Sequence, residues 1–199
     1  MSLVNELFCQ VPYKAPSWLA SNVDPDLIPE SKMELGRFPT PYHKFNLDAE
    51  QCGGLDMWIK RDDLSSFDLG GNKVRKLQFL LAKAQSEGCD TIVTIGGVQS
   101  NHCRATCVAS RQMGMDSYLI LRTRGEKIDP PEILNDSLVG NLLFDRMVDA
   151  KIRTVTAAQY AEVGADALLQ QLKEELEAQG KKPYVVPMGG SNAGKWCNR

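Results

Sequence analysis

Short runs of β-branched and aromatic residues alternate with longer segments of helical periodicity, and this alternation is the feature that most constrains the fold. Strands are predicted at TIVTI from Thr91, SYLIL from Ser117, KIRTV from Lys151 and YVVP from Tyr184. Helical segments separate these runs. Strands connected by helices in this order pair in parallel, with helices on both faces of the sheet. We therefore predict an α/β fold built on open parallel sheets.

The helices of this pattern have recognisable starts and ends. Apolar residues recur at helical spacing from Val74 to Ala84, with Asn72 placed to cap the start and Gly88 to end the helix. Further helices are predicted over about 101–113, 136–150 and 157–179. Residues 1 to about 50 hold most of the turn signals, which predicts an extended, wrapping segment. DMWIK from Asp56 is predicted to be a short buried strand.

Composition excludes several classes of function. The 199 residues are 43% hydrophobic and 24% charged, with a formal net charge of −2. No Lys- or Arg-rich tract is present to neutralise many phosphates, so we expect no nucleic-acid partner. No apolar run reaches the length of a membrane span, and acidic residues in the first thirty positions argue against a targeting peptide. We expect a soluble, cytoplasmic protein with no membrane partner; a mitochondrial location is the alternative.

Two loops that lead from predicted strands into predicted helices carry the candidate site. The first holds Gly70, Gly71, Asn72 and Lys73, and the second reads GGVQSNH over 96–102. In open α/β sheets, ligands bind beyond the carboxyl ends of the strands. Unpaired backbone N–H groups at a helix start favour anions. Both loops are therefore predicted to face a ligand that carries negative charge.

Lys73 can be interpreted either as a solvated surface charge or as a reactive amine. A lysine in the first turn of a helix is usually a solvated charge, and it opposes the positive end of the helix dipole. The same dipole, with partial burial, favours a neutral and nucleophilic amine, as in Schiff-base lysines. Arg75 and Lys76 are predicted to be solvent-facing or phosphate-steering charges. The GGNKV sequence does not match a Walker A loop.

The second loop leaves alternatives open. Ser100 and Asn101 are each compatible with a simple helix cap, whereas Gln99, Ser100 and Asn101 together suit a substrate carboxylate. His102 is open between capping, packing and proton transfer. His102, Cys103 and Cys107 lack the ligand number and spacing of a zinc site, so no metal is predicted.

Two central motifs resemble one family in combination. KRDDLSSFDLGGNKVRKL and IGGVQSNHCRAT resemble the D-cysteine desulfhydrase and 1-aminocyclopropane-1-carboxylate (ACC) deaminase family, and the resemblance covers about Leu35 to Ala193 through SYLILRT, LVGNLLFDRM and KKPYVVPMGGSN. The eukaryotic D-cysteine desulfhydrase branch is the most similar. The resemblance implies the cofactor pyridoxal 5′-phosphate (PLP) and the PLP fold type II, which is tryptophan-synthase-β-like.

The resemblance also implies residue roles. Lys73 would hold PLP covalently, with Asn72 beside it in the cofactor loop. Ser100 matches the active-site serine near the substrate, and Asn101 matches the asparagine that bonds the phenolic oxygen of the cofactor. Gln99 would help to build the carboxylate pocket. Lys73 and Ser100 are both candidates for the base that removes the α-proton of the substrate.

The implied reaction converts D-cysteine and water to pyruvate, hydrogen sulfide and ammonia. In the deaminase branch, the same chemistry opens the cyclopropane ring of ACC to give 2-oxobutanoate and ammonia. The implied partners are a small amino-acid substrate and, in full-length relatives, a second copy in a homodimer.

The chain departs from the family pattern at its C-terminal end. After GGSNA the family continues with a leucine-glycine-x-tryptophan-glycine-tyrosine run and a long second half, whereas this sequence ends in GKWCNR. That half supplies the glycine-rich loop that grips the PLP phosphate. We therefore expect an incomplete fold in which 1–73 begin the larger PLP domain, 74–160 form a smaller α/β domain, and 161–199 return to the larger domain. Two alternatives remain: a catalytically inactive truncated isoform that binds full-length subunits, and an anion-binding α/β module without covalent chemistry.

Overall fold

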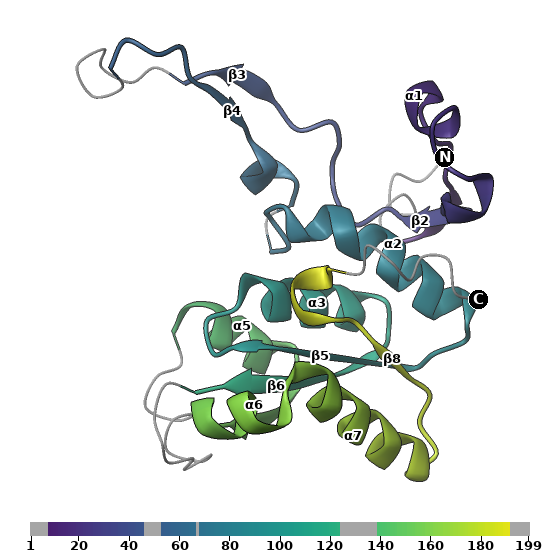
Figure 1. The fold of residues 1–199 in the computed structure, drawn as a ribbon, viewed down its shortest axis with the longest axis vertical. Helices are drawn as coiled ribbons and strands as arrows, with labels where there is room; N and C mark the ends of the chain where they lie inside the picture. The colour runs from purple at the N-terminus through teal and green to yellow at the C-terminus, as the bar shows by residue number, and fades with distance from the viewer. Residues whose placement is uncertain (1–7, 46–52, 67, 124–138, 192–199) are drawn as a thin grey trace.

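A four-stranded parallel sheet forms the centre of the molecule (Figure 1). The structure is a computed structural model, and it describes residues 8–45, 53–66, 68–123 and 139–191. The strand order is β7-β6-β5-β8, and every neighbouring pair is parallel. The strands are β5 (Thr91–Gly97), β6 (Asp116–Arg122), β7 (Lys151–Val155) and β8 (Pro183–Val185). The predicted parallel α/β sheet is confirmed.

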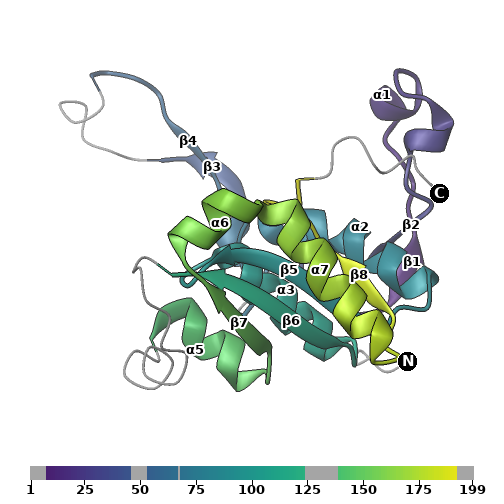
Figure 2. The same ribbon diagram turned by 60° about the horizontal axis from the view of Figure 1, so that its bottom comes forward.

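Helices cover both faces of this sheet, as Figure 2 shows. Consecutive residues of β5 point to opposite faces, as the pleat of a strand requires. Ile92 packs with the apolar residues of α2 (Lys73–Ser86) and α3 (Asn101–Gln112), and α5 (Gly140–Met147) adds Leu142 to the same cluster. Val93 packs on the other side against α7 (Ala165–Ala178). Each buried strand is therefore apolar on both faces, which explains the continuous TIVTI run.

The helix predicted from Val74 to Ala84 is confirmed as α2, but its predicted cap is wrong. Asn72 occupies the position before the helix, and its side chain accepts no capping hydrogen bond. Its backbone is already helical, with φ −62° and ψ −17°, whereas a capping residue is normally extended. Gly88 lies just beyond the helix with φ +68°, a conformation that favours glycine, so the predicted end is correct.

The single helix predicted over 157–179 is two helices in the structure. A capping box of Thr156 and Gln159 starts α6 (Ala157–Val163), and α7 follows after Gly164. Gly164 has φ +84° and ψ 156°, which a helix cannot accommodate. The break allows α7 to turn onto β5 and β8. The predicted start of α5 at 136 lies outside the described residues.

The segment before α2 is extended, as predicted, and forms two small antiparallel ladders. The first pairs β1 (Gln10–Pro12) with β2 (Ser31–Met33), which lies on α2, and encloses α1 (Ser17–Ala20) and the 3₁₀ turn η2 (Pro25–Leu27). The second pairs β3 (Tyr42–Lys44) with β4 (Trp58–Lys60) and extends away from the sheet (Figure 1).

The prediction that DMWIK is a buried strand is wrong. Trp58 is 55% exposed, and its ring stacks on Tyr42 of the paired strand with centroids 5.2 Å apart. An aromatic and aliphatic run fits a buried strand only where another layer covers it. The described residues place no second layer over this ladder, and β4 pairs with β3 alone.

Arg75 joins the base of this ladder to the start of α2. Its guanidinium donates two hydrogen bonds of 2.7 Å to the carboxylate of Asp62, in the 3₁₀ turn η3 (Asp62–Leu64), and a third of 3.1 Å to the Thr40 hydroxyl. The hydrogen bonds from Arg75 lower the pKa of Asp62 to about 2. The prediction of a phosphate-steering Arg75 is therefore wrong, because a carboxylate neutralises it; its side chain is still 42% exposed, in keeping with the solvent-facing alternative.

The hydroxyl of Thr94 ties β5 to two other parts of the molecule. Its oxygen lies 2.7 Å from the Val186 carbonyl oxygen and 2.8 Å from Nε2 of His102. A carbonyl can only accept, so the single hydroxyl proton goes to Val186. Nε2 of His102 must then carry a proton and donate it to Thr94. This chain links β5, the first turn of α3 and the segment that follows β8.

Asp145 of α5 is fully buried against α3. Its Oδ1 accepts a hydrogen bond of 3.1 Å from the thiol of Cys107, and its Oδ2 has no partner among the described residues. Burial raises the pKa of Asp145 to about 6. Burial also raises the pKa of Cys107, which keeps the thiol protonated as a donor. Burial therefore favours the neutral form of this carboxyl group over the charged form.

None of the described helices is both long and apolar enough to cross a membrane. The predicted division at residues 73 and 160 stays a prediction. In the described structure, β8 from the third predicted segment joins the same sheet as β5 from the second.

We expect Asp145→Asn to stabilise the chain increasingly as pH rises from 4 to 7. A carboxyl group whose pKa is higher in the folded than in the unfolded state favours folding below its unfolded pKa, and this contribution is lost as pH rises through the folded value. A shift from 3.8 to about 6 corresponds to roughly 3 kcal/mol at neutral pH. Urea unfolding of variant and wild type at several pH values measures the difference.

Asp149→Asn is the matched control, because Asp149 is exposed and Lys151 lowers its pKa. Its contribution to stability appears above the unfolded pKa, so this variant should change in the opposite direction with pH. A pH-independent difference between Asp145→Asn and wild type would contradict the assignment.

We expect Thr94→Val to lower the free energy of unfolding by about 3 kcal/mol, because it leaves the His102 N–H and the Val186 carbonyl buried without partners. Thr106→Val is the control: Thr106 is equally buried, and its hydroxyl has no partner among the described residues. The free energy of unfolding of that variant should lie within about 0.5 kcal/mol of the wild-type value, or above it. Equal losses in the two variants, measured by denaturant unfolding, would show that the Thr94 chain adds nothing.

Candidate active site

Two lysine side chains from the first turn of α2 converge on one backbone carbonyl. Nζ of Lys73 lies 3.5 Å from the oxygen of Gly189, and Nζ of Lys76 lies 3.1 Å from the same oxygen. Lys76 also reaches the Ser191 hydroxyl at 3.5 Å. Both side chains are partly buried. Lys76 is thus turned toward the Gly189 carbonyl, and the predicted role of steering a phosphate stays a prediction.

The carbonyl belongs to the 3₁₀ turn η4 (Met188–Gly190), which contacts α2, α3 and β5. Gly189 has φ +67°, and a Cβ added there would lie 3.6 Å from Nζ of Lys73. A Cβ on Gly190 would lie 3.3 Å from Cδ of Lys76. A side chain at position 190 would press on the Lys76 stem, whereas a Cβ at position 189 would only touch the Lys73 amine, and the positive φ there favours glycine.

His102 is buried near these two ammonium groups. Burial first, and then the positive charges of Lys73 and Lys76, lower the pKa of His102 to about 4, while the Pro187 carbonyl opposes the shift. The imidazole is therefore neutral at physiological pH. Its Nε2–H is committed to Thr94, and its Nδ1 has no partner among the described residues. Of the three alternatives left open by the sequence, the structure supports packing.

Ser100 caps α3 at the carboxyl end of β5. Its hydroxyl oxygen accepts a hydrogen bond of 3.2 Å from the backbone N–H of Cys103, and the same hydroxyl also hydrogen-bonds the Cys103 side chain. A Cβ on Gly96 would lie 2.7 Å from Oγ of Ser100 and 2.6 Å from Sγ of Cys103. Only glycine at position 96 permits the helix to start this close to the strand.

Gln99 and Asn101 are connected to the start of α5. The Gln99 amide donates to the Val139 carbonyl at 3.0 Å and accepts from the backbone N–H of Asn141 at 2.9 Å. The Asn141 side chain donates to the Gln99 carbonyl and to Oδ1 of Asn101, each at 2.9 Å. Asn141 is a site residue that the sequence reasoning missed. The LVGNLLFDRM motif contained it, but its place beside Asn101 is a property of the fold.

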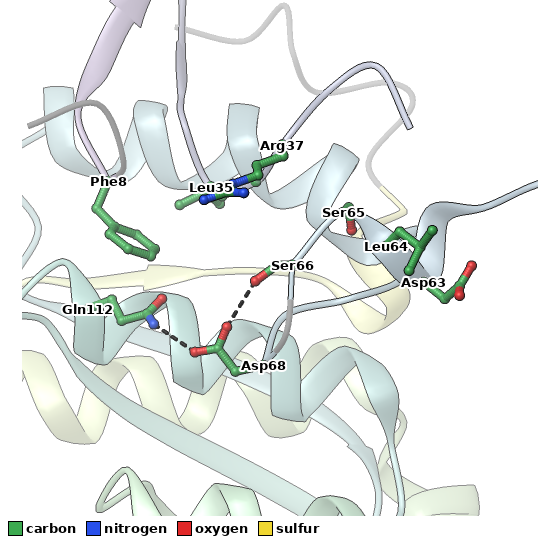
Figure 3. A pocket seen from close by; sticks show the side chains of 10 residues that line it. Phe8, Leu35, Arg37, Asp63, Leu64, Ser65, Ser66, Asp68 and Gln112 are labelled. Carbon is green, nitrogen blue, oxygen red and sulfur yellow. Dashed lines mark hydrogen bonds between the residues drawn. The ribbon is translucent and has the colours of Figure 1, made fainter. Parts of the chain in front are cut away.

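The loop that leads into α2 is held in place by α3. The Arg104 guanidinium donates to the carbonyls of Asp68 and Gly70, the latter at 3.2 Å. The Asp68 carboxylate accepts from Ser66 at 2.9 Å and from Gln112 at 2.8 Å, as Figure 3 shows.

A pocket of about 590 Å³ lies beside this loop (Figure 3). The N-terminal segment contributes Phe8, Leu35 and Arg37 to its lining, and the loop contributes Asp63 and Asp68 among others. None of the predicted site residues lines it. We interpret the pocket as the space between the wrapping segment and the loop.

The predicted residues fall into two groups in the structure. Lys73 contacts the Gly189 carbonyl, whereas Gln99 and Asn101 are hydrogen-bonded to Asn141. Ser100 lies between Gln99 and Asn101 in the sequence. Among the described residues, no hydrogen bond joins Lys73 or Asn72 to Ser100 or Asn101; Asn72 is exposed at the start of α2. Both groups lie where helices begin. The roles of all five residues remain predictions.

This donor set suits PLP. The half-buried primary amine of Lys73 could bind the aldehyde, and the room left by Gly189 lies at the amine itself. Ser100 and Asn101 supply a hydroxyl and an amide at the start of α3. Within the described ranges, no three His, Cys, Asp or Glu side chains gather as a metal site would require.

Curated relatives carry related names. The chain is 48% identical over 186 residues to the mitochondrial bifunctional D-cysteine desulfhydrase/1-aminocyclopropane-1-carboxylate deaminase of Arabidopsis thaliana. This alignment covers 93% of the chain and 44% of the Arabidopsis protein. It is 42% identical over 139 residues to a putative 1-aminocyclopropane-1-carboxylate deaminase of Pyrococcus abyssi, covering 70% of this chain and 38% of that protein. A D-cysteine desulfhydrase of Salmonella heidelberg is 36% identical over 162 residues, covering 81% of this chain and 47% of that protein.

A solved structure supports the same relationship. A crystal structure of an ACC deaminase homologue superposes with a TM-score of 0.67 at 32% identity, covering 85% of this chain and 49% of that one. The predicted fold type II is thereby confirmed. The chain spans less than half the length of these relatives. The family model described as pyridoxal-phosphate dependent enzyme matches residues 33–197, and the chain belongs to this family of PLP-dependent enzymes.

Proposed function

We propose that this chain carries the lysine-bearing half of a D-cysteine desulfhydrase, which converts D-cysteine and water to pyruvate, hydrogen sulfide and ammonia. The observation that carries the proposal is the partly buried amine of Lys73, placed at the start of α2 against the Gly189–Gly190 turn. The names of the Arabidopsis and Salmonella relatives support this substrate.

ACC deaminase activity is the second candidate. The Pyrococcus relative carries that name alone, and the Arabidopsis relative carries both. Sulfide release from D-cysteine and 2-oxobutanoate release from ACC distinguish the two activities when each substrate is supplied separately.

The chain's own residues divide the work as follows. Lys73 would hold the cofactor through its ε-amino group, with Asn72 beside it, and the side-chain amide of Asn101 would bind the phenolic oxygen. The bound cofactor supplies an electron sink for an amino acid that has lost its α-proton. Ser100 would face the substrate carboxylate from the start of α3, and Gln99, whose amide is bonded to Val139 and Asn141, would help to build the wall of that pocket.

Lys73 is the preferred base for the α-proton. Its ε-amino group is a primary amine that, in its neutral form, could accept a proton at Nζ. The Ser100 hydroxyl is the alternative, but it still carries its own proton, and the described residues place no base against it. We therefore assign proton removal to Lys73 and substrate positioning to Ser100.

Cellular location and assembly belong to the same proposal. We place the protein in the cytoplasm; the Arabidopsis relative is named as mitochondrial, which keeps that compartment as the alternative. The substrate is a small amino acid, and the full-length assembly is a homodimer.

Covalent trapping tests the proposal. The chain is incubated with PLP, reduced with borohydride, digested and mapped by mass spectrometry. We expect the pyridoxyl group on Lys73 and a complete loss of that labelled peptide in Lys73→Ala.

Two further variants sharpen the result. In Lys76→Ala, which removes the neighbouring amine at the same carbonyl, the label should remain on Lys73. Lys83→Ala, on the last turns of α2, should be labelled like wild type. A label on Lys76, or an unlabelled wild-type chain, would refute the assignment of Lys73.

A further inference from the structure

Asn141 occupies a junction between the second site loop and α5. Its backbone N–H donates to Oε1 of Gln99, and its side-chain Nδ2 lies 2.9 Å from both the Gln99 carbonyl oxygen and the Oδ1 of Asn101. Thus 40 residues of sequence separate Asn141 from Asn101, and one hydrogen bond joins them.

The donors and acceptors in this network admit one orientation of each amide. The Gln99 backbone carbonyl can only accept, so the Asn141 atom beside it must be the NH₂ group. The same NH₂ group donates to Asn101, so Asn101 must present its oxygen to Asn141. The NH₂ group of Asn101 therefore points away from Asn141.

The position of Asn141 is itself fixed. The Gln99 side-chain amide makes two hydrogen bonds to the start of α5: it donates to the Val139 carbonyl and accepts from the Asn141 backbone N–H. Gly140 between them has φ +59°, and a Cβ there would lie 2.6 Å from Oε1 of Gln99. Only glycine allows this close approach, so the segment presents Asn141 in a single place.

We propose that Asn141 is a positioning residue that sets the amide of Asn101 so that its NH₂ group is available to an anionic oxygen of the cofactor. This inference rests on the proposed function, which gives Asn101 that oxygen as its partner. Without the hydrogen bond from Asn141, the amide can rotate and turn its own oxygen toward the anion, which repels it. Asn101 is exposed, so packing alone does not fix its orientation.

The test compares Asn141→Ala with Asn141→Asp by the PLP concentration that gives half-maximal borohydride trapping on Lys73. Alanine removes the donor, and we expect this concentration to rise about tenfold, the worth of one hydrogen bond to a charged group. Aspartate offers only acceptors, so it holds Asn101 in the reversed orientation. We expect a rise on the order of 100-fold for this variant.

A structural role alone predicts a different order. Aspartate has nearly the shape of asparagine and is favourable at a helix start, but it loses the hydrogen bond to the Gln99 carbonyl, as alanine does, and sets a carboxylate oxygen against that carbonyl oxygen. Denaturant unfolding therefore measures the stability of both variants, and trapping is compared per folded molecule. Weaker trapping in Asn141→Asp on that scale is the signature of the positioning role. Val139→Asp places the same charge on an exposed side chain at the same helix start, and its half-maximal concentration should stay within about twofold of wild type. Trapping in Asn141→Asp that equals or exceeds that in Asn141→Ala would overturn the proposal.

A second measurement separates this proposal from the proposed function. In the chain without cofactor, NMR exchange of the Asn101 side-chain amide protons with water should be fast in wild type and slower in Asn141→Asp, where those protons are bonded to the carboxylate. Slow exchange in wild type would overturn the orientation. An untrapped wild type with the expected exchange would refute the proposed function and leave the orientation standing.

Discussion

The hydroxyl of Thr94 is the contact on which the arrangement of the site depends. It has one proton, and the Val186 carbonyl takes it, so the His102 ring must donate in return. One oxygen thereby fixes the end of β8 against β5 and sets the tautomer of a histidine in α3. Gly189 follows Val186 by three residues, and the lysines of α2 meet its carbonyl. The place of the lysine amines relative to the sheet is thus connected to a buried side chain that touches neither of them.

The sequence predicted the sheet well because its strands are apolar on both faces and lie between helices. The same reasoning was wrong for DMWIK, since the residue types of a strand do not reveal whether a second layer covers it, and Trp58 finds only Tyr42. It also missed the break at Gly164, because apolar spacing continues on both sides and only the backbone conformation shows the interruption. Local sequence patterns indicate the secondary structure that a residue favours, whereas contacts with residues distant in sequence determine whether it is buried and where an element ends.

The candidate site shows the same division. Lys73 and Ser100 could be singled out from the sequence, because a lysine and a serine at glycine-rich helix starts form motifs within a few residues; their roles stay predictions. Asn141 could not, because its importance lies in a contact with Asn101 across 40 residues. The charge of Lys76 was noted in the sequence, but its direction was not, since either face of the first helical turn was open to it. Arg75 was misjudged for the same reason, because Asp62 lies 13 residues away.

The three basic side chains in the first turn of α2, Arg75 and the lysines Lys73 and Lys76, differ in how their charges are paired. Arg75 is neutralised by Asp62, and it serves to hold α2. Among the described ion pairs, Lys73 and Lys76 have no carboxylate partner; both point at a neutral carbonyl. His102, the nearest titratable ring, is kept neutral partly by these two charges and adds none of its own. Within a single turn of α2, the fold therefore separates a basic side chain that is paired with a carboxylate from two that have no such partner among the described ion pairs, and the proposed anionic cofactor would supply that partner.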